Sequence, residues 1–246
     1  MESDLASKSA IRISVVVPTF NEADRIAATV GMIRRAGGDE MVVVDGGSSD
    51  GTARIAREAG TDTVLESDAS RGGQLALGCN HASGEIILML HADACLPPAS
   101  LKQLRADAEA FLPNRPGDGF ERPYWGCLTQ RIDSDRRSMR IIELGNRLRA
   151  RWLRLPMGDQ GIFVHRETLQ RIGGVDDVPL LEDVRLSRRL RRMSPPRILA
   201  VPITISDRRW RRDGVLRRTL GNWMILAAHR CGVSETRLAS WYTRAK

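Results

Sequence analysis

Short apolar runs alternate with amphipathic segments along the first ninety residues of the chain. The apolar runs are rich in β-branched and aliphatic residues, as in strands buried on both faces, and they lie at 11–17, 41–44, 63–65 and 85–90. Helical spacing of apolar residues predicts helices between these runs, at 22–35, 52–59 and 71–82. Asn21 is the expected N-cap of the first helix. This order predicts an α/β fold whose mostly parallel sheet carries helices on both faces.

The second half of the chain is less regular. Strands are expected at 125–132 and 197–205, and helices at 138–155, 180–193 and 215–231. Proline and glycine are frequent in 113–123, which predicts a surface loop, and the polar residues 1–10 predict a disordered tail. With no internal repeat, the simplest organisation is a single domain over 11–246 that ends in a largely helical part.

Composition narrows the class of protein. Hydrophobic residues make up 42% of the 246 residues, which is typical of a globular chain and excludes a disordered one. No apolar run reaches about 18 residues and the N-terminus lacks the apolar core of a secretory signal, so we expect neither a transmembrane helix nor export. The four cysteines form no C-x-x-C pair, which is typical of free thiols in a cytoplasmic protein.

Polar clusters follow three of the predicted strands, at 18–22, 45–52 and 91–93. Because the carboxyl ends of parallel strands meet at one edge of a sheet, these clusters are expected to form one ligand site. Asp45 at a strand end can accept hydrogen bonds from a base or a ribose, and Gly47 lets the backbone approach a flat ring. Ordinary turn and cap chemistry is the alternative interpretation of either cluster alone. A P-loop and a dinucleotide-binding G-x-G-x-x-G are both absent.

The sequences VVVPTFNE at 15–22 and VVDGGSSDGT at 43–52 resemble the two opening signatures of family-two glycosyltransferases, which have the GT-A fold. The resemblance continues in order through Arg71-Gly72, Asn80, HAD at 91–93 and Glu182-Asp183, and covers about 11–210. It implies a nucleotide-sugar-binding half at 11–112 and an acceptor half at 113–246. The nucleotide-sugar-binding positions that it implies are Pro18, Thr19, Phe20, Glu22, Asp45, Gly47, Ser48, Arg71, Ala92 and Arg209.

The HAD sequence is the expected metal site. The resembled family usually has Asp-x-Asp here, and Asp93 matches its last carboxylate, a ligand suited to Mg²⁺ or Mn²⁺ beside a diphosphate. His91 replaces the first carboxylate, and an imidazole suits Mn²⁺ better than Mg²⁺. Some relatives use a third ligand two residues later, where this chain has Cys95, a poor ligand for either ion. A buried histidine in a strand-end turn is the alternative for His91.

Glu182 and Asp183 are the expected catalytic pair. By the resemblance, Asp183 is the general base that takes a proton from the acceptor during an inverting transfer. Stabilisation of a helix N-terminus by two acids is the alternative. The resemblance also implies acceptor-binding roles for four residues: Asp159, Gln160, Glu182 and Trp210. Trp210 lies in the run 208–212, whose arginines suit phosphate oxygens or form a solvated basic loop.

Basic charge is concentrated in the second half. The net charge is +8, and seven arginines between 136 and 154 are mixed with leucine, isoleucine and tryptophan. Such a helix suits an anionic membrane surface. Nucleic-acid binding fits the charge as well. A helix packed on the core is a third interpretation.

We therefore predict a cytoplasmic, inverting, metal-dependent glycosyltransferase, placed peripherally on the inner face of the membrane. The donor is expected to be a UDP-sugar, with GDP-mannose as an alternative, and the acceptor a hydroxyl or carboxyl group. The chain resembles small single-domain transferases associated with radical-SAM and selenoprotein-type genes, and also carotenoid-acid glycosyltransferases, which would make the acceptor a lipid; nucleic acid is not an expected partner. The rival classes are a sugar nucleotidyltransferase, whose Gly-rich opening loop is absent, and a non-catalytic module that binds anionic polymers.

Overall fold

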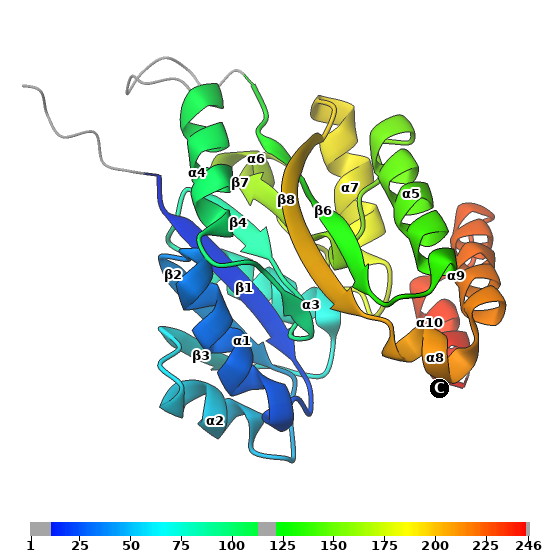
Figure 1. Cartoon of the computed structure of the whole chain (residues 1–246), viewed down its shortest axis with the longest axis horizontal. Helices are drawn as coiled ribbons and strands as arrows, with labels where there is room; N and C mark the ends of the chain where they lie inside the picture. The colour runs from blue at the N-terminus through cyan, green and yellow to red at the C-terminus, as the bar shows by residue number, and fades with distance from the viewer. Residues whose placement is uncertain (1–10, 113–121, 245–246) are drawn as a thin grey trace, which may run out of the picture.

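The computed structural model describes residues 11–112 and 122–244, which form one curled sheet flanked by helices (Figure 1). The expected tail at 1–10 and most of the expected loop at 113–123 lie outside the described residues. The strands are β1 (Ile13–Thr19), β2 (Glu40–Asp45), β3 (Thr63–Glu66), β4 (Ile86–Met89), β5 (Ala94–Cys95), β6 (Trp125–Asp133), β7 (Ile162–His165) and β8 (Arg197–Ser206). Their order in the sheet is β3-β2-β1-β4-β7-β6-β8-β5.

The helices alternate with these strands in the first half and gather at one end in the second. They are α1 (Ala23–Ala36), α2 (Thr52–Glu58), α3 (Arg71–His81), α4 (Ser100–Phe111), α5 (Arg137–Trp152), η1 (Gly158–Gln160), α6 (Arg166–Arg171), α7 (Glu182–Met193), α8 (Arg208–Asp213), α9 (Val215–Arg230) and α10 (Glu235–Arg244). In the described parts of the chain, no helix is long and apolar enough to cross a bilayer.

The sheet is parallel in its first half and mixed beyond it. β1 pairs in parallel with β2 and β4, and β2 with β3, as the alternation of strands and helices predicts. β7 then enters between β4 and β6 and runs antiparallel to both, and the parallel pair β6–β8 and the antiparallel pair β8–β5 complete the sheet. The α/β fold is therefore confirmed, with a mixed sheet.

Both faces of the sheet are covered. Along β1, Val15 and Val17 pack on one side with α1 and α4, while Val16 packs on the other with α3 and α7. All three valines are fully buried. This explains the continuous apolar run, since a strand covered on both faces has no polar side. The carboxyl ends of β1, β2 and β4 are left facing α7, and the functional site lies there.

The predicted N-cap of α1 is wrong. Asn21 has a positive φ of 53°, and Glu22 occupies the cap position without a side-chain hydrogen bond to the helix. The Asn21 side chain instead accepts a hydrogen bond from the backbone N–H of Ser49 at 3.0 Å. Asparagine tolerates the left-handed conformation, and here it joins two loops instead of capping its own helix.

Candidate active site

The loops after β1 and β2 are held together by hydrogen bonds. The Asn21 N–H donates to the Ser48 hydroxyl at 2.8 Å, in addition to the bond from Ser49 to Asn21. The Ala23 N–H donates to Asp50 at 3.0 Å. The two segments with the family resemblance therefore form one rigid unit at the sheet edge.

Asp45 is the centre of this unit. Its side chain is buried and accepts hydrogen bonds from the Ser48 N–H at 2.8 Å, the Ser48 hydroxyl at 2.6 Å and the Thr19 hydroxyl at 3.1 Å. Gly47, with φ of 78°, provides the left-handed turn that brings Ser48 back to the carboxylate. In this structure Asp45 holds the loop in shape. Its carboxylate would keep these three hydrogen bonds while it contacts a nucleotide.

Gln74, which the sequence motifs do not mark, joins the ends of β1 and β2. Its Nε2 donates to the carbonyl oxygens of Thr19 and Val44, both at 2.8 Å. The Gln74 side chain also packs closely against Gly46. A Cβ at position 46 would lie 3.1 Å from Gln74 Nε2, a tight contact. A buried glutamine in α3 gives no sequence signal of its own, because its partners are main-chain atoms.

The other residues expected to bind the nucleotide sit around this unit. Phe20 is 53% exposed at its rim, and the Glu22 carboxylate pairs with Arg25 at 2.8 Å. Ala92 is buried, and its carbonyl accepts from the Thr29 hydroxyl at 2.8 Å. The fourth, Pro18, lines a pocket between β4, α3 and α7.

That pocket is lined by Pro18, Arg71, Leu75, Met89, Leu90, His91, Gly158, Ile162, Val175, Glu182, Asp183 and Leu186. The structure thus brings Pro18, Arg71, His91, Glu182 and Asp183 together, although they are separated by more than 160 residues of sequence.

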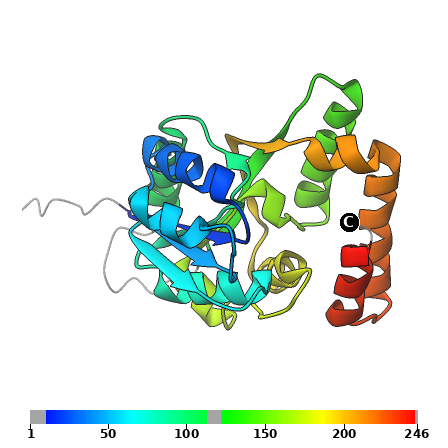
Figure 2. The same ribbon diagram turned by 90° about the horizontal axis from the view of Figure 1, so that it is seen from below.

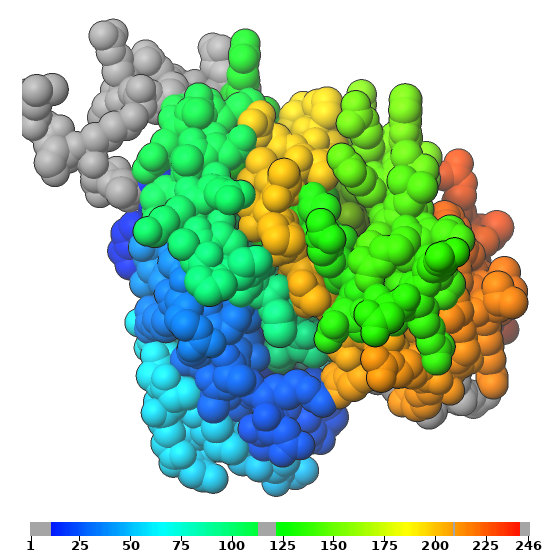
Figure 3. All heavy atoms as spheres, in the orientation of Figure 1, coloured from blue at the N-terminus to red at the C-terminus, as the bar shows by residue number. Residues whose placement is uncertain are grey.

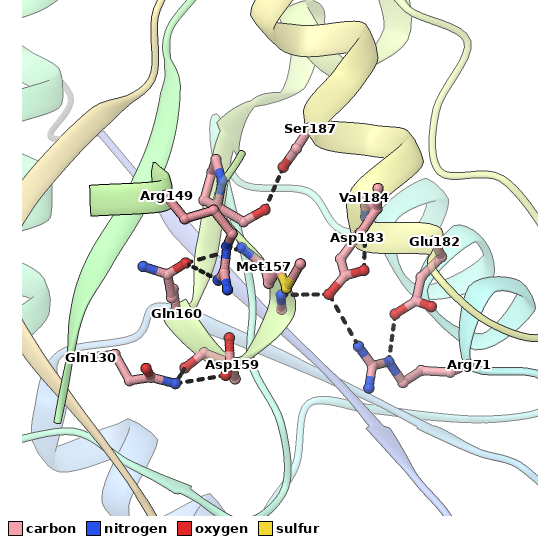
Figure 4. A network of polar contacts seen from close by, with 12 residues as sticks. Arg71, Gln130, Arg149, Met157, Asp159, Gln160, Glu182, Asp183, Val184 and Ser187 are labelled. Atoms are coloured by element: carbon pink, nitrogen blue, oxygen red, sulfur yellow. Dashed lines mark hydrogen bonds and ion pairs between the residues drawn. The ribbon is translucent and has the colours of Figure 1, made fainter. Parts of the chain in front are cut away.

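Arg71 lies at the start of α3 and connects it to α7 (Figure 4). Its Nε donates to Glu182 Oε1, and its Nη2 lies 3.6 Å from Asp183 Oδ2. The close approach requires a glycine next to it, because a Cβ on Gly72 would lie 2.5 Å from the carbonyl oxygens of Asp176 and Val178. The backbone at position 72 therefore accepts only glycine, and this close packing of α3 brings Arg71 to the acidic pair.

Glu182 and Asp183 begin α7, as predicted, but their environments differ. The Glu182 side chain is buried, and burial raises its pKa, an effect that the adjacent Arg71 opposes. The Asp183 side chain is 14% exposed and accepts from the N–H groups of Gly158 and Val184, both at 2.7 Å. A carboxylate has about four acceptor positions, so these bonds fix Asp183 while leaving it able to accept from a ligand.

Gly158 is the point at which the polar groups of the pocket converge. A Cβ on this residue would lie 2.9 Å from Arg71 Nη2, 2.9 Å from His91 Nε2 and 3.3 Å from Asp183 Oδ2. His91 therefore reaches the same small space as the guanidinium and the carboxylate. A guanidinium, an imidazole and a carboxylate at one point of a pocket can hold a negatively charged group and accept a proton beside it.

Asp159 and Gln160 follow in η1, where Gln160 is held by Arg149 of α5 and Asp159 by Gln130 of β6. Gln160 is buried, and its Oε1 accepts from Arg149 Nη2 at 3.0 Å and from the Met157 N–H at 3.1 Å, so it positions the η1 loop. Gln130 Nε2 donates to Asp159 Oδ2 at 2.6 Å (Figure 4). Asp159 Oδ1 is buried and has no hydrogen-bond partner among the described residues. Burial raises the pKa of Asp159, as it does that of Glu182.

Asp93 is the residue of the HAD sequence that suits a divalent cation. Its carboxylate is 20% exposed and lies 3.6 Å from Arg208 Nη2. Within the described ranges, no three histidine, cysteine or acidic side chains cluster as a metal site, and Cys95 adds no such third ligand. The protein side of the site is therefore one carboxylate with one imidazole nearby in sequence, a set that fits Mn²⁺ when substrate oxygens complete the shell.

The basic run at 208–212 forms α8, whose first residue lies next to Asp93. Arg208 approaches Asp93, while Arg211 pairs with the buried Asp207 at 2.6 Å. Trp210 is partly buried against the main core cluster. The side chain of Arg209, the expected phosphate contact, lies outside the described residues. The sequence motif indicates the whole basic run, and the structure shows that Arg208 lies beside Asp93.

Known proteins with similar sequences are glycosyltransferases. The chain is 34% identical over 82 residues to glycosyltransferase AglJ of Haloferax volcanii, a match that covers 33% of this chain and 27% of that protein. It is 32% identical over 104 residues to undecaprenyl-phosphate 4-deoxy-4-formamido-L-arabinose transferase of Edwardsiella ictaluri, covering 37% of this chain and 32% of that protein. The chain thus matches about a third of the length of these relatives.

Solved structures with the same fold include two nucleotide-sugar enzymes. A mannosyltransferase from Pyrobaculum calidifontis in complex with GDP-Man and Mn²⁺ has a TM-score of 0.59 and 24% identity, over 79% of this chain and 56% of that one. Glucosyl-3-phosphoglycerate synthase from Mycobacterium tuberculosis, in complex with Mn²⁺, UDP and glucosyl-3-phosphoglycerate, has a TM-score of 0.55 and 21% identity, over 81% and 71%. These likenesses confirm the GT-A fold.

The family assignment rests on the longest match. Residues 14–161, which include both opening loops, the HAD sequence and η1, match the family described as Glycosyl transferase family 2. This match covers more than half of the chain and contains most of the residues that line the pocket. The chain belongs to glycosyl transferase family 2.

Proposed function

We propose that this protein is an inverting glycosyltransferase that uses a nucleoside-diphosphate sugar, with UDP as the nucleotide, and that Asp183 is its general base. The observation that carries the proposal is the convergence of Arg71, His91 and Asp183 at Gly158. The diphosphate of a nucleotide sugar is negatively charged and would be stabilised by the guanidinium of Arg71. The incoming acceptor needs a carboxylate close to its proton, and Asp183 supplies one.

Residues 11–112 supply the donor side in this proposal. The joined loops after β1 and β2 hold the base and ribose against Thr19, Asp45 and Ser48, and Arg71 faces the diphosphate. Arg71 suits this task because its guanidinium binds phosphate oxygens in a planar fork. Its side chain is 37% exposed, so it can contact a ligand while it remains beside Glu182.

A divalent cation, with Mn²⁺ preferred, belongs at Asp93 in this proposal, with His91 as a second ligand. Bound there, it would neutralise charge that develops on the leaving diphosphate. Asp93 offers the hard oxygen ligand, and Arg208 lies beside it with a positive charge. Mn²⁺ is present with nucleotide ligands in both of the structural neighbours described above.

The chemical step is a single displacement. The acceptor oxygen forms a bond to the anomeric carbon as the bond from that carbon to the diphosphate oxygen breaks, and the acceptor proton passes to Asp183. The N–H groups of Gly158 and Val184 hold the carboxylate in place for this transfer. Asp159, at the end of the same loop, is the proposed contact for a polar group of the acceptor.

The proposed acceptor is the hydroxyl, carboxyl or phosphate group of a lipid, and the proposed location is peripheral, on the inner face of the membrane. Proton transfer to Asp183 applies to a hydroxyl acceptor, because a carboxyl or phosphate acceptor is already ionised at neutral pH and attacks without a base. The support comes from the undecaprenyl-phosphate transferases among the relatives.

Thermal unfolding with a panel of UDP-, GDP-, TDP- and CDP-sugars, each with and without Mn²⁺, tests the donor assignment. A ligand that binds only the folded state raises Tm, by an amount that depends on its concentration relative to Kd. We expect UDP-sugars with Mn²⁺ to give the largest rise. A rise with GDP-mannose alone would change the nucleotide, and no rise with any sugar nucleotide would contradict the proposal.

A further inference from the structure

Exposed apolar side chains gather at one end of the molecule. Of the twelve large hydrophobic residues that are exposed in the described chain, Phe20 lies at the nucleotide loops and Met193 at the end of α7. The other ten belong to α5, the turn after it, α9 and α10: Ile141, Leu144, Leu148, Trp152, Leu153, Leu216, Leu220, Trp223, Met224 and Trp241. A soluble monomer rarely exposes so many apolar side chains together, so this end has a partner.

Helix α5 has a buried side and an exposed apolar side. Met139 and Ala150 are fully buried against the core. The exposed apolar residues Ile141, Leu144, Leu148 and Trp152 follow helical spacing, so they form one stripe that faces away from the sheet. Trp152, at 74% exposed, is the most exposed of them. The packed-helix and membrane-surface interpretations of this segment thus describe its two opposite sides.

Helix α9 adds a second apolar stripe of the same kind. None of its residues is buried, and Leu216, Leu220, Trp223 and Met224 are each more than half exposed. It packs against α8 and α10, and the hairpin is anchored by the buried Leu238 of α10. Figures 1 and 2 place α5 and α9 on the same side of the molecule, and Figure 3 shows their green and orange surfaces together at its right edge.

The charge of this end limits what it can bind. Residues 137–154 and 215–244 contain eleven arginines and two acidic residues. Both acids are largely covered and paired, Glu143 with Arg140 and Glu235 with Arg185, each at 2.8 Å. A two-fold contact between copies of this chain would therefore place arginines against arginines. A nucleic acid would satisfy the charge but leave the leucine and methionine side chains in water.

We propose that the exposed sides of α5 and α9 together form a docking face for an anionic phospholipid bilayer. The tryptophans and aliphatic residues enter the interface between headgroups and acyl chains, and the arginines contact lipid phosphates. This inference rests on the proposed function only in assigning a lipid acceptor. The requirement for an anionic lipid surface distinguishes this proposal from nonspecific apolar binding.

The docking face is connected directly to the catalytic pocket. The chain leaves α5 through Leu153, whose carbonyl accepts from Arg191 of α7 at 2.9 Å, and reaches η1 and Gly158 within five residues. On the other side, Glu235 of α10 pairs with Arg185, which lies two residues after Asp183. A bilayer at this face therefore lies beside the two elements that hold the proposed base, where a membrane-borne acceptor would enter.

Vesicle sedimentation tests the docking face without any measurement of activity. The full chain is mixed with neutral phosphatidylcholine vesicles and with vesicles that contain phosphatidylserine or phosphatidylglycerol, at low and high salt. We expect binding to the anionic vesicles that falls with salt. Arg147→Gln with Arg151→Gln should lower it roughly tenfold or more, and Trp223→Ser with Met224→Ser should lower it on every anionic composition.

Matched controls keep the result specific. Met193→Ser removes an exposed apolar side chain outside the face, and Arg54→Gln with Arg57→Gln removes two exposed arginines on α2; both should bind vesicles as the parent does. Unchanged Tm of each variant shows that the chain still folds. The inference is overturned if the parent ignores lipid charge, if the face variants bind like the controls, or if the face instead forms dimers that Trp223→Ser with Met224→Ser separates.

The donor measurement separates this inference from the proposed function. Donor-dependent stabilisation with no vesicle binding would overturn the docking face and leave the glycosyltransferase assignment intact. Vesicle binding without donor stabilisation would do the reverse. Binding to single-stranded DNA that competes fully with vesicles and is lost in the arginine variants alone would reassign the face to a polyanion and also overturn the inference.

Discussion

The carboxylate of Asp93 lies 3.6 Å from the guanidinium of Arg208, so the proposed metal ligand already has a cationic neighbour. The pair joins the turn after β4 to α8. Because the Arg208 side chain is 51% exposed, it can turn away when a cation approaches the carboxylate. The two residues are therefore expected to respond differently to substitution.

Asp93→Ala is expected to abolish the Mn²⁺-dependent part of donor binding, since the only carboxylate of the HAD sequence is lost. Arg208→Ala should retain the Mn²⁺ dependence and weaken donor binding by roughly tenfold, the effect of losing one charge-assisted contact. Donor affinity measured over a range of Mn²⁺ concentrations checks both. Full metal dependence in Asp93→Ala, with the fold intact, would remove the metal assignment.

Asp183→Asn is expected to lower kcat by about 10²–10⁴-fold, the usual contribution of a general base, with little change in donor Kd. Asparagine keeps the hydrogen bond from Gly158 but cannot accept the proton. Glu182→Gln should have a smaller effect, because the buried Glu182 pairs with Arg71 and so holds the guanidinium in place. If Asp183→Asn retains more than about a tenth of kcat while Asp159→Asn is inactive, Asp159 is the base.

Gly158→Ala is expected to reduce kcat strongly while changing Tm little. The added methyl group would meet the ends of the Arg71 and His91 side chains at 2.9 Å, and flexible ends can move aside. The movement would displace the groups that the mechanism needs. Gly145→Ala in α5 is the matched control, because no atom lies within 4 Å of its Cβ position and alanine favours a helix. Equal activity in the two variants would contradict the proposed geometry.

Asp159 is expected to lower stability at neutral pH. Burial raises its folded pKa, so the folded state holds the proton more readily than the unfolded chain. The stabilisation from this group is then complete below the unfolded pKa and is lost as pH rises through the folded pKa. Asp159→Asn should therefore raise Tm at about pH 8 by a few degrees, at roughly 2–4 °C per kcal/mol.

Thermal unfolding of the parent and of Asp159→Asn across pH checks this sign. The difference in Tm should shrink as pH falls below about 4, where the carboxyl of the parent becomes protonated in both states. The same variant should raise the acceptor KM if Asp159 contacts the acceptor. A Tm difference that stays constant with pH, or that changes sign, would show that neighbouring groups offset the cost of burying the ionised Asp159 carboxylate.

The parallel half of the fold was predictable because its signals are local. A strand buried on both faces must be apolar throughout, and the loops that follow such strands carry their polar residues in short clusters. The same clusters, with the family resemblance, pointed to Asp45, Asp93 and Asp183. These residues need no distant partner to be noticed, since strand ends and a helix start mark them in the sequence.

The remaining features depend on contacts between distant segments. β7 has only four residues, too few to show a period, yet it lies at the centre of the sheet between β4 and β6. The convergence at Gly158 depends on the glycine's position relative to α3 and β4. Gln74 and Arg149 are polar residues that the fold buries and satisfies with main-chain and amide oxygens. No local pattern distinguishes such residues from exposed ones.

Helix α5 serves two environments at once, and this constrains how its sequence can change. On its inner side, Arg149 donates hydrogen bonds to the Leu155 carbonyl, the Asn146 amide oxygen and the Gln160 amide oxygen. A substitution of Arg149 would therefore disturb η1. The outer stripe has no such partners, and one aliphatic residue can replace another. The outer side, which belongs to the proposed docking face, can therefore vary in sequence during evolution, while the inner side must keep the residues that hold η1 in place.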